Sequence, residues 1–381
     1  MELIQIAELL NETLVPNLLG QETTLAPDLS NIVDLGVALE DLTGKEVENY
    51  AQTFVVGVSR NLFETRLYKS SYYGLMNDAR EYGGVIQRAR AKDFIDATDS
   101  HIWTLVDGTD YFDGTYHGTE LDVRVYSQDN AFKVVHSIPT EEFKQYFTSA
   151  DGVSDLVALI EANVRNSVEV KLEALAKSTL QELIANAAGD SRVLHMVTLY
   201  NSIFTPETDL TTATCLHDVN FLRWYVEQTL RLRDMLRDVN KKYNDGTVPT
   251  FTPEEDIRVT MLTEVDKAIV CSMLADTYHK DLLSIGEYNT INFWQNAGTT
   301  LLPSLGVTAE VKYQGADDES ATTISSVAAV LYDRYSCGLT ARLSKTTSSY
   351  IGAEDFTNYY HHIANSRFVD PRNAAVVLAL D

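Results

Sequence analysis

A run of apolar residues at helical spacing between Ser154 and Gly189 limits the folds open to this chain more than any other feature. No proline or glycine interrupts the run before Gly189, and Ser154 is a favourable residue for a helix start. The apolar positions recur every three or four residues, as on the buried face of a helix: Leu156, Leu159, Ile160, Val164, Val168, Leu172, Leu175, Leu183 and Ile184. The pattern predicts a helix over residues 154–187, which would be ~50 Å long at ~1.5 Å per residue. Such a helix needs a large or extended body to lie against.

Composition places the chain among globular proteins with a substantial core. Of its 381 residues, 45% are hydrophobic and 22% are charged, proportions that are typical of folded domains. The net charge is −25, which weighs against a general binder of the nucleic-acid backbone, because such binders are usually basic. A charge of this size favours solubility and makes copies of the chain repel one another.

The cysteines and the N-terminus indicate where the protein is made. Cys215, Cys271 and Cys337 are far apart and odd in number, which favours free thiols in a reducing compartment over a disulfide framework. The N-terminal sequence MELIQIAELL has no positively charged start and carries acids within its apolar run, unlike a signal peptide. No window approaches the ~18 apolar residues of a membrane span. We therefore expect a protein made inside the cell, without a membrane partner.

The first hundred residues contain two segments of opposite charge. Residues 1–50 hold ten acids and one base, and their first apolar positions suit a short amphipathic helix, so we expect an arm that packs on another surface. Residues 60–92 hold seven bases and three acids. Alternation in VIQRARAKDFI places Arg88, Arg90 and Lys92 on one side of a strand. That side is either a solvated face or a contact with an acidic surface, which would be DNA or the arm of another copy.

The remaining pattern predicts an α+β fold with no βαβ repetition. A turn-rich stretch, DGTDYFDGTYHGTE, precedes two strand-like runs around residues 128–130, and this region is expected to be an extended hairpin. Helices are expected at residues 218–240 and 263–275, the second with a capping box formed by Thr263 and Asp266. Strands are expected at residues 257–262, 325–332, 356–369 and 374–380. The last two would pair as a terminal hairpin around the turn Asp370–Asn373.

Motifs for common chemistries are absent. The sequence lacks the glycine-rich nucleotide loops, the GxSxG nucleophile motif and the HExxH zinc motif. Asp107, Asp110 and Asp113 are three residues apart, whereas a calcium loop places its ligands at alternate positions. No cysteine or histidine pair has zinc-finger spacing. We therefore predict no catalytic, cofactor-binding or metal-binding residues, and no cofactor.

The stretch TNYYHH, residues 357–362, is the strongest candidate for an exception. In a strand, neighbouring side chains point to opposite faces, so His361 and His362 would diverge and could not readily share one metal ion. Tyr360 and His362 would share a face. We interpret the stretch as strand packing, with Tyr360 and His362 as candidate subunit contacts. An acid–base or metal site in a soluble acidic enzyme is the alternative.

The C-terminal half resembles a known family. The segments VAAVLYDR, DFTNYY and FVD…AVVLAL, with TPEEDIRVTML, INFWQNAGT and FLRWYVEQTL upstream, are similar in pattern and order to tailed-bacteriophage major capsid proteins of the Hong Kong 97-like fold. The resemblance covers about residues 150–381. It implies an N-terminal arm at 1–50, an extended hairpin (E-loop) at 51–140, a peripheral domain with its spine helix at 141–190, an axial domain at 191–325, and closing strands at 326–381.

The resemblance implies a structural protein and not an enzyme. Copies would self-assemble as hexamers and pentamers into an icosahedral shell around packaged double-stranded DNA, with scaffolding and portal proteins as partners. Assembly would take place in the bacterial host cytoplasm, and the protein would end in the virion capsid. Arg88, Arg90 and Lys92 become candidate contacts between subunits, and crosslinking through Lys92 has no supporting pattern. A cellular nanocompartment shell that holds enzyme cargo is the alternative within this fold.

Overall fold

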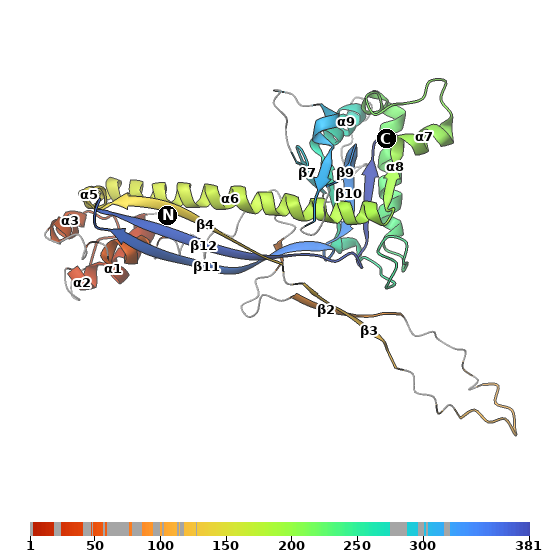
Figure 1. Ribbon diagram of the computed structural model, residues 1–381, viewed down its shortest axis with the longest axis horizontal. Coiled ribbons are helices and arrows are strands. Elements are labelled where there is room, and N and C mark those ends of the chain that lie inside the picture. Colours follow the sequence, from red (N-terminus) through yellow and green to blue (C-terminus); the bar gives the residue numbers. More distant parts are fainter. Residues whose placement is uncertain are drawn as a thin grey trace. The chain divides into compact units, whose positions relative to one another are not determined.

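A computed structural model gives the fold of the chain (Figure 1). The structure describes residues 3–18, 24–40, 47, 49–55, 58, 76–77, 86–93, 100, 103–112, 114, 118–126, 128–274, 288–295, 301, 304–315 and 321–381. The chain forms two compact units. The first comprises Met1–Gly84, Asp129–Leu175 and Thr340–Ser366, and the second comprises Val85–Gln128, Ala176–Leu339 and Arg367–Asp381.

The predicted long helix is present as α6, Ala150–Gly189, with 40 residues and therefore ~60 Å of length. It begins four residues before Ser154, so the predicted cap residue is wrong, and it ends two residues beyond the predicted end at 187. Ser149 occupies that role, because its hydroxyl accepts a hydrogen bond from the Gly152 amide at 3.1 Å. Of its predicted apolar face, Leu159 is 45% exposed, whereas other members are buried in the core of the first unit: Leu156, Ile160, Val164, Val168 and Leu172. Val153 and Val157, which were not predicted, join them.

Residues of the predicted arm form part of that same core. Helices α1 (Leu3–Thr13), α2 (Val15–Leu18) and α3 (Ile32–Glu40) precede α5 (Thr140–Tyr146) in the order of the first unit. Buried side chains of α1, of α3 and of the segments between the helices join the cluster that includes the start of α6: Ile6, Leu10, Leu14, Leu25, Leu29, Ile32, Leu35 and Leu39. Phe54 packs edge-on against Phe143 and Phe147. The apolar side chains of these helices therefore pack on their own chain, and an arm that docks on another copy stays a prediction.

The strands form two larger sheets. Among the described residues, β1 (Met76–Asn77), β11 (Cys337–Ile351), β12 (Phe356–Val369) and β4 (Gln128–Pro139) make one sheet in that order. A second sheet has the order β5 (Val193–His195), β13 (Ala375–Ala379), β10 (Val327–Asp333), β6 (Ile257–Leu262) and β7 (Tyr288–Ile291). Every residue of β10 and β13 is buried, as expected for central strands covered on both faces.

Two predicted strand pairings are wrong. The turn Asp370–Asn373 is present, since the Asn373 amide donates to the Asp370 carbonyl at 3.2 Å. However, β12 belongs to the first sheet, while β13 pairs with β10 and β5 in the second. The turn therefore joins two sheets instead of closing a terminal hairpin. The runs on either side of residue 127 also separate, because β3 (Leu121–Tyr126) pairs with β2 (Ile86–Ala91) and β4 joins the first sheet.

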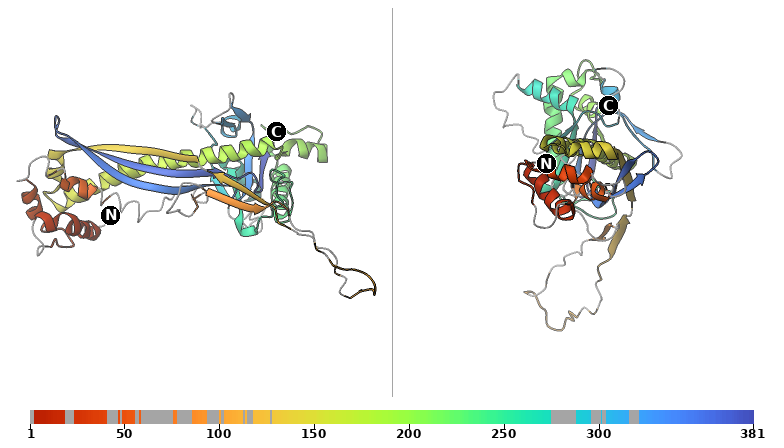
Figure 2. Two further views of the ribbon diagram at one scale, coloured as in Figure 1. Left: turned by 60° about the horizontal axis from the view of Figure 1, so that its bottom comes forward. Right: turned by 90° about the vertical axis from the view of Figure 1, so that its left-hand side faces the viewer.

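The helices that follow α6 along the chain lie beside the second sheet and are coloured mainly green to cyan (Figure 2). They are α7 (Met196–Phe204), α8 (Val219–Met235), α9 (Thr263–Leu274) and the short α10 (Leu305–Thr308). Single turns of 3-10 helix lie at Cys215–His217 and Glu254–Asp256, and a small ribbon joins β8 (Val311–Tyr313) to β9 (Thr322–Ile324). Asp218 caps α8 by accepting from the Phe221 amide at 2.8 Å.

The short-range predictions for this half are largely right, with one exception. Strand β6 has the predicted bounds, and α9 ends one residue early. The predicted capping box does not form, because the Thr263 hydroxyl bonds to Asn292 at 2.9 Å and Asp266 accepts from the Tyr288 hydroxyl at 2.6 Å. Cys215 and Cys337 are buried, Cys271 is exposed, and all three are free thiols. No described helix has the length and apolar character needed to span a bilayer.

Candidate assembly site at the base of the hairpin

A buried ion pair lies in the turn between β12 and β13. Arg372 and Asp370 are both fully buried, and the guanidinium donates to the carboxylate in two parallel hydrogen bonds, Nε–Oδ1 and Nη2–Oδ2, each of 2.9 Å. The Arg372 amide adds a third bond to Asp370 Oδ1 at 3.2 Å. Paired bonds of this kind combine charge with fixed geometry. Because the two residues are only two positions apart in sequence, these bonds fix the conformation of the turn.

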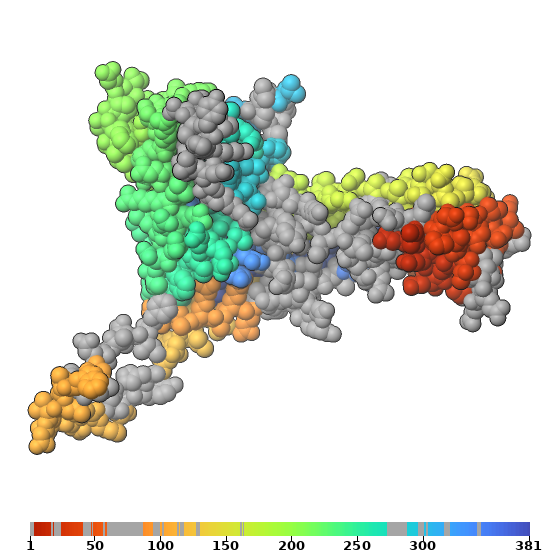
Figure 3. Space-filling model, turned by 180° about the vertical axis from the view of Figure 1, so that it is seen from behind, coloured from red at the N-terminus to blue at the C-terminus, as the bar shows by residue number. Residues whose placement is uncertain are grey.

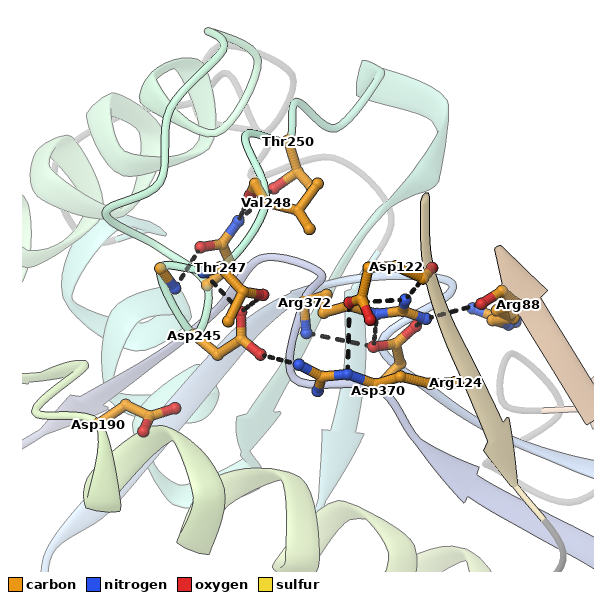
Figure 4. A network of polar contacts seen from close by, with 12 residues as sticks. Arg88, Asp122, Arg124, Asp190, Asp245, Thr247, Val248, Thr250, Asp370 and Arg372 are labelled. Carbon is orange, nitrogen blue, oxygen red and sulfur yellow. Dashed lines mark hydrogen bonds and ion pairs between the residues drawn. The ribbon is translucent and has the colours of Figure 1, made fainter. Parts of the chain in front are cut away.

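The same guanidinium joins this turn to both strands of the hairpin. Arg372 Nη1 donates to the carboxylate and to the carbonyl of Asp122 on β3, each at 3.1 Å. Its Nη2 lies 3.4 Å from the Arg88 carbonyl oxygen on β2. One buried side chain therefore contacts three segments that are far apart in sequence (Figure 4). This contact defines the base of the hairpin.

Electrostatics keep this pair charged. Burial alone would raise the pKa of Asp370, but the hydrogen bonds and positive charge of Arg372 outweigh it and lower that pKa. Burial opposes the charge of Arg372, and its bonds to Asp370 and Asp122 more than compensate, so its pKa is raised. A buried charge is tolerated only when it is paired and hydrogen-bonded. Here the Arg372 guanidinium and the Asp370 carboxylate pair with each other.

The arginines predicted to face another subunit lie against their own chain. Arg88 Nη1 donates to the Tyr335 carbonyl at 2.6 Å, and its guanidinium carbon is 4.3 Å from the centre of the Phe368 ring. Arg90 donates to the side chain of Asn373. Their placement on one side of a strand is as predicted, yet that side faces the turn. The side chain of Lys92 is exposed and pairs with Glu120 at 2.9 Å. The rest of the basic segment, apart from β1, lies outside the described residues.

Asp245, in the loop after α8, contacts both the hairpin and the turn at the hairpin base. Arg124 on β3 pairs with Asp245 at 3.0 Å. The Asp245 amide donates to the Pro371 carbonyl at 2.9 Å, and its carboxylate accepts from the Thr247 amide at 3.0 Å. Asp245 therefore bridges the hairpin to the turn from the loop side (Figure 4). All of these residues lie within the second unit. Their ion pairs and hydrogen bonds attach the hairpin strands to the turn and to the loop after α8.

The stretch TNYYHH forms part of β12, and its alternation is as predicted. Tyr359 and His361 are buried, while Tyr360 is half-buried and His362 is exposed on the other face. His362 Nε2 lies 3.2 Å from the Thr347 hydroxyl, and the Lys133 ammonium lies 5.6 Å from the Tyr360 ring centre. Their role as subunit contacts stays a prediction. Among the described residues, no group of three or more His, Cys, Asp and Glu could hold a metal ion.

The buried face of this stretch carries a stacked histidine pair. The rings of His361 and His136 are 5.1 Å apart and nearly parallel, and His361 Nε2 lies 3.2 Å from His136 Nδ1. Thr346 lies 3.0 Å from the other nitrogen of His361, while His136 Nε2 has no hydrogen-bond partner among the described residues. Burial lowers the pKa of His136. Burial, with the charges of His136 and His362, lowers the pKa of His361 to about 4.

Sequence reasoning missed the partners that make the base. Asp122, Arg124, Asp370 and Arg372 were not among the predicted site residues. One signal was present: Asp370 and Arg372 stand two apart between two strongly apolar strands. Charged residues are rarely buried unless they are paired, so their position already indicated an ion pair. The partners on β3 could not be inferred, because the contact spans about 250 residues of sequence.

The chain was compared with family models, curated proteins and solved structures. A family model described as Phi29-like phage major capsid protein matches residues 20–379. Comparison with curated proteins found no match. The structure is similar to the capsid of Staphylococcus phage Andhra, at 11% identity and a TM-score of 0.48, over 81% of this chain and 84% of that one. It is also similar to the capsid of Cyanophage P-SCSP1u, at 14% identity and a TM-score of 0.44, over 82% of this chain and 89% of that one.

Proposed function

The chain belongs to the Phi29-like phage major capsid protein family, and from that membership we propose that its copies assemble as hexamers and pentamers into an icosahedral shell around packaged phage DNA. It is a structural capsid protein with the α+β, Hong Kong 97-like architecture expected from the sequence. The observation that carries the proposal is the extent of the family match, which includes the hairpin, the long helix and the closing strands.

The tip of the hairpin supports contact between copies. Between β2 and β3, Trp103 is 94% exposed and Phe112 is 85% exposed, and Leu105 and Val106 are also exposed. Clustered exposed apolar side chains on a soluble protein usually mark an interaction site. The buried base gives this tip a defined attachment to the second unit. We infer that the tip is covered by neighbouring subunits in the shell.

The basic residues of the hairpin take a different role from the one first expected. Arg88 and Arg90 have partners in their own chain, so we infer that they influence assembly by holding the hairpin in place. Direct contact with DNA or with an acidic arm would require those bonds to break. Lys92, Tyr360 and His362 remain proposed contacts between subunits.

Other partners follow from the proposed role. Scaffolding and portal proteins would direct closure of the shell, and double-stranded DNA would lie at its inner face without sequence-specific contacts. The net charge of −25 weighs against tight binding of DNA by the chain as a whole, which suits a container. We propose that the chain has no catalytic activity and that assembly takes place in the bacterial host cytoplasm before the protein enters the virion.

Expression of the chain with its scaffolding protein tests the proposal. Sedimentation and negative-stain microscopy should reveal closed particles, or hexameric and pentameric rings where closure is incomplete. A homogeneous monomer under these conditions would contradict it. The contents of the particles address the nanocompartment alternative, which the family match does not favour, because such a shell would enclose an enzyme and not DNA.

A further inference from the structure

Strand β4 lies at the edge of the first sheet. Its hydrogen-bonded neighbour is β12, and among the described residues no strand pairs with its other side. Figure 1 shows β4, β12 and β11 running beside α6. Because an edge strand has one neighbour, its contacts with that neighbour decide how readily it opens. The side-chain contacts between β4 and β12 therefore control whether β4 stays in the sheet.

Two histidines make such a contact on the covered face of the sheet. His361 on β12 is fully buried, and its Nε2 atom lies 3.2 Å from Nδ1 of His136 on β4. The planes of the two rings are inclined by 5°. The other ring nitrogen of His361 lies 3.0 Å from the hydroxyl of Thr346 on β11. Polar contacts thus connect three adjacent strands through two imidazoles.

The surroundings of this pair are apolar. Tyr359 and Ile363 of β12 belong to one buried cluster with the N-terminal helices and the start of α6. In the space-filling view, the described residues of those helices (red) and of α6 (yellow) are seen at the surface of the first unit (Figure 3). The charges that act on His361 are those of His136 and His362, and among the described residues no carboxylate contributes to the pKa of either histidine of the pair. A positive charge on this pair therefore has no counter-ion.

The contact between the two rings depends on their protonation. One facing nitrogen must donate a hydrogen bond and the other must accept it, as two neutral imidazoles can do. A first added proton leaves one lone pair for the contact, but it places an unpaired charge in an apolar core, which is costly. A second proton puts an N–H on both facing nitrogens, and the contact is lost. Acid therefore opposes this contact in two steps.

We propose that the contact between His136 and His361 is an acid-sensitive latch, which holds β4 on β12 at neutral pH and releases the strand in acid while β11 and β12 stay paired. In the open strand, both imidazoles reach water and take up protons without the penalty of burial. The latch is a property of the first unit alone. It therefore goes beyond the proposed shell function and does not depend on assembly.

The release ends before the first residue of α5. The Thr140 amide donates to the Asp355 carbonyl at 3.0 Å, and the Thr140 hydroxyl donates to the Asp355 carboxylate at 2.9 Å. Hydrogen bonds from Tyr350 and Thr140 lower the pKa of Asp355, so this carboxylate stays ionised at pH 5 and its bonds persist there. The opening is therefore expected over residues 128–136, with the end next to Thr140 still attached.

The size of the effect follows from His361. Its pKa is about 4 in the closed strand, against 6.5 for an exposed histidine. Between pH 7.5 and pH 5, that difference raises the ratio of open to closed β4 by ~30-fold. Burial also lowers the pKa of His136, which adds to this factor.

Hydrogen–deuterium exchange of the full, unassembled chain at pH 7.5 and pH 5 tests the latch. Dividing each exchange rate by the intrinsic rate at that pH leaves the contribution of opening. The amides of β4 that bond to β12 should lose protection by ~30-fold in acid. The amides shared by β11 and β12, and those of β13 in the second sheet, should keep theirs. Unchanged protection of β4, or an equal loss in all three places, would overturn the proposal.

Variants assign the effect to the histidine pair. His136→Gln combined with His361→Gln replaces both imidazoles with amides that do not titrate, and should remove the pH dependence of β4 protection. If that variant does not fold, His136→Gln alone should reduce the dependence to that of one imidazole. His217→Gln is the matched control, because His217 is exposed in the second unit, and it should keep the full dependence. The full dependence in a folded variant of the pair, or its loss in His217→Gln, would overturn the proposal.

Discussion

At the scale of single residues, Arg372 is the side chain on which the hairpin base depends most. Replacing it with Met leaves the buried Asp370 carboxylate without its two paired bonds. Removing one partner of a buried ion pair typically costs ~3–5 kcal/mol. We expect Arg372→Met to lower the free energy of unfolding by about that amount, measured by chemical denaturation of the unassembled chain. The double variant with Asp370→Asn should recover part of the loss. Equal stability of Arg372→Met and the wild type would contradict the assignment.

The histidine pair predicts a dependence of stability on pH. The pKa of His361 is lowered from 6.5 to about 4 in the folded chain, and that of His136 is also lowered. The unfolded chain therefore takes up protons near pH 6.5 that the folded chain does not bind until the pH approaches 4. Stability should fall as pH decreases across this window, by at most about 1.4 kcal/mol per pH unit for each histidine.

Thermal melting at pH 7.5 and pH 5 measures this slope. His361→Gln should flatten it, because one of the two buried imidazoles is gone. His362→Gln removes an exposed histidine whose charge is a lesser cause of the lowered pKa of His361, so it should flatten the slope less than His361→Gln does. Identical slopes for the wild type and both variants would contradict the role of the buried pair. The alternation of TNYYHH was predictable from period-two spacing, whereas the partner His136 was not, because it lies about 225 residues away.

At the scale of elements, α3 approaches the end of α5 closely. A Cβ atom placed on Gly36 would lie 2.5 Å from the Phe147 carbonyl oxygen, well inside contact distance. We expect Gly36→Ala to destabilise the chain by ~1–3 kcal/mol, as overpacking does. Gly189→Ala is the matched control, because a Cβ atom there has no neighbour within 4 Å. The denaturation midpoint should fall only for Gly36→Ala, and equal midpoints would show that α3 lies farther from α5.

Elements were predictable where local pattern and burial agree. Helix α6 keeps its apolar spacing over 40 residues, β10 is a buried, mostly apolar run, and the first half of β12 alternates between buried and more exposed positions. Their pairing was not predictable, because register and neighbour choice depend on contacts far apart in sequence. The turn Asp370–Asn373 shows this directly: its residues predict a turn, but nothing local indicates that it joins two sheets.

At the scale of the whole molecule, the family resemblance and the fold agree on a structural capsid protein. The long α6 and a paired ribbon in the hairpin region were expected from the sequence, whereas the long strand β11 was not. Which face of the β2–β3 ribbon points to solvent was not expected. Alternation of Arg88 and Arg90 located a charged side of a strand, and a charged side normally faces solvent. Here a buried Arg372 and Asp370 draw that side inward, which leaves Val123 and Val125 exposed on the other side.

Electron cryomicroscopy of the purified virion, at a resolution that distinguishes side chains, tests the central claim most directly. The account predicts a shell built from this chain in hexamers and pentamers. In that shell, Arg372 remains bonded to Asp370 and Asp122 of its own copy. A shell built from a different protein would contradict the capsid assignment. A shell of this chain in which Arg372 is separated from Asp122 would contradict the account of the hairpin base.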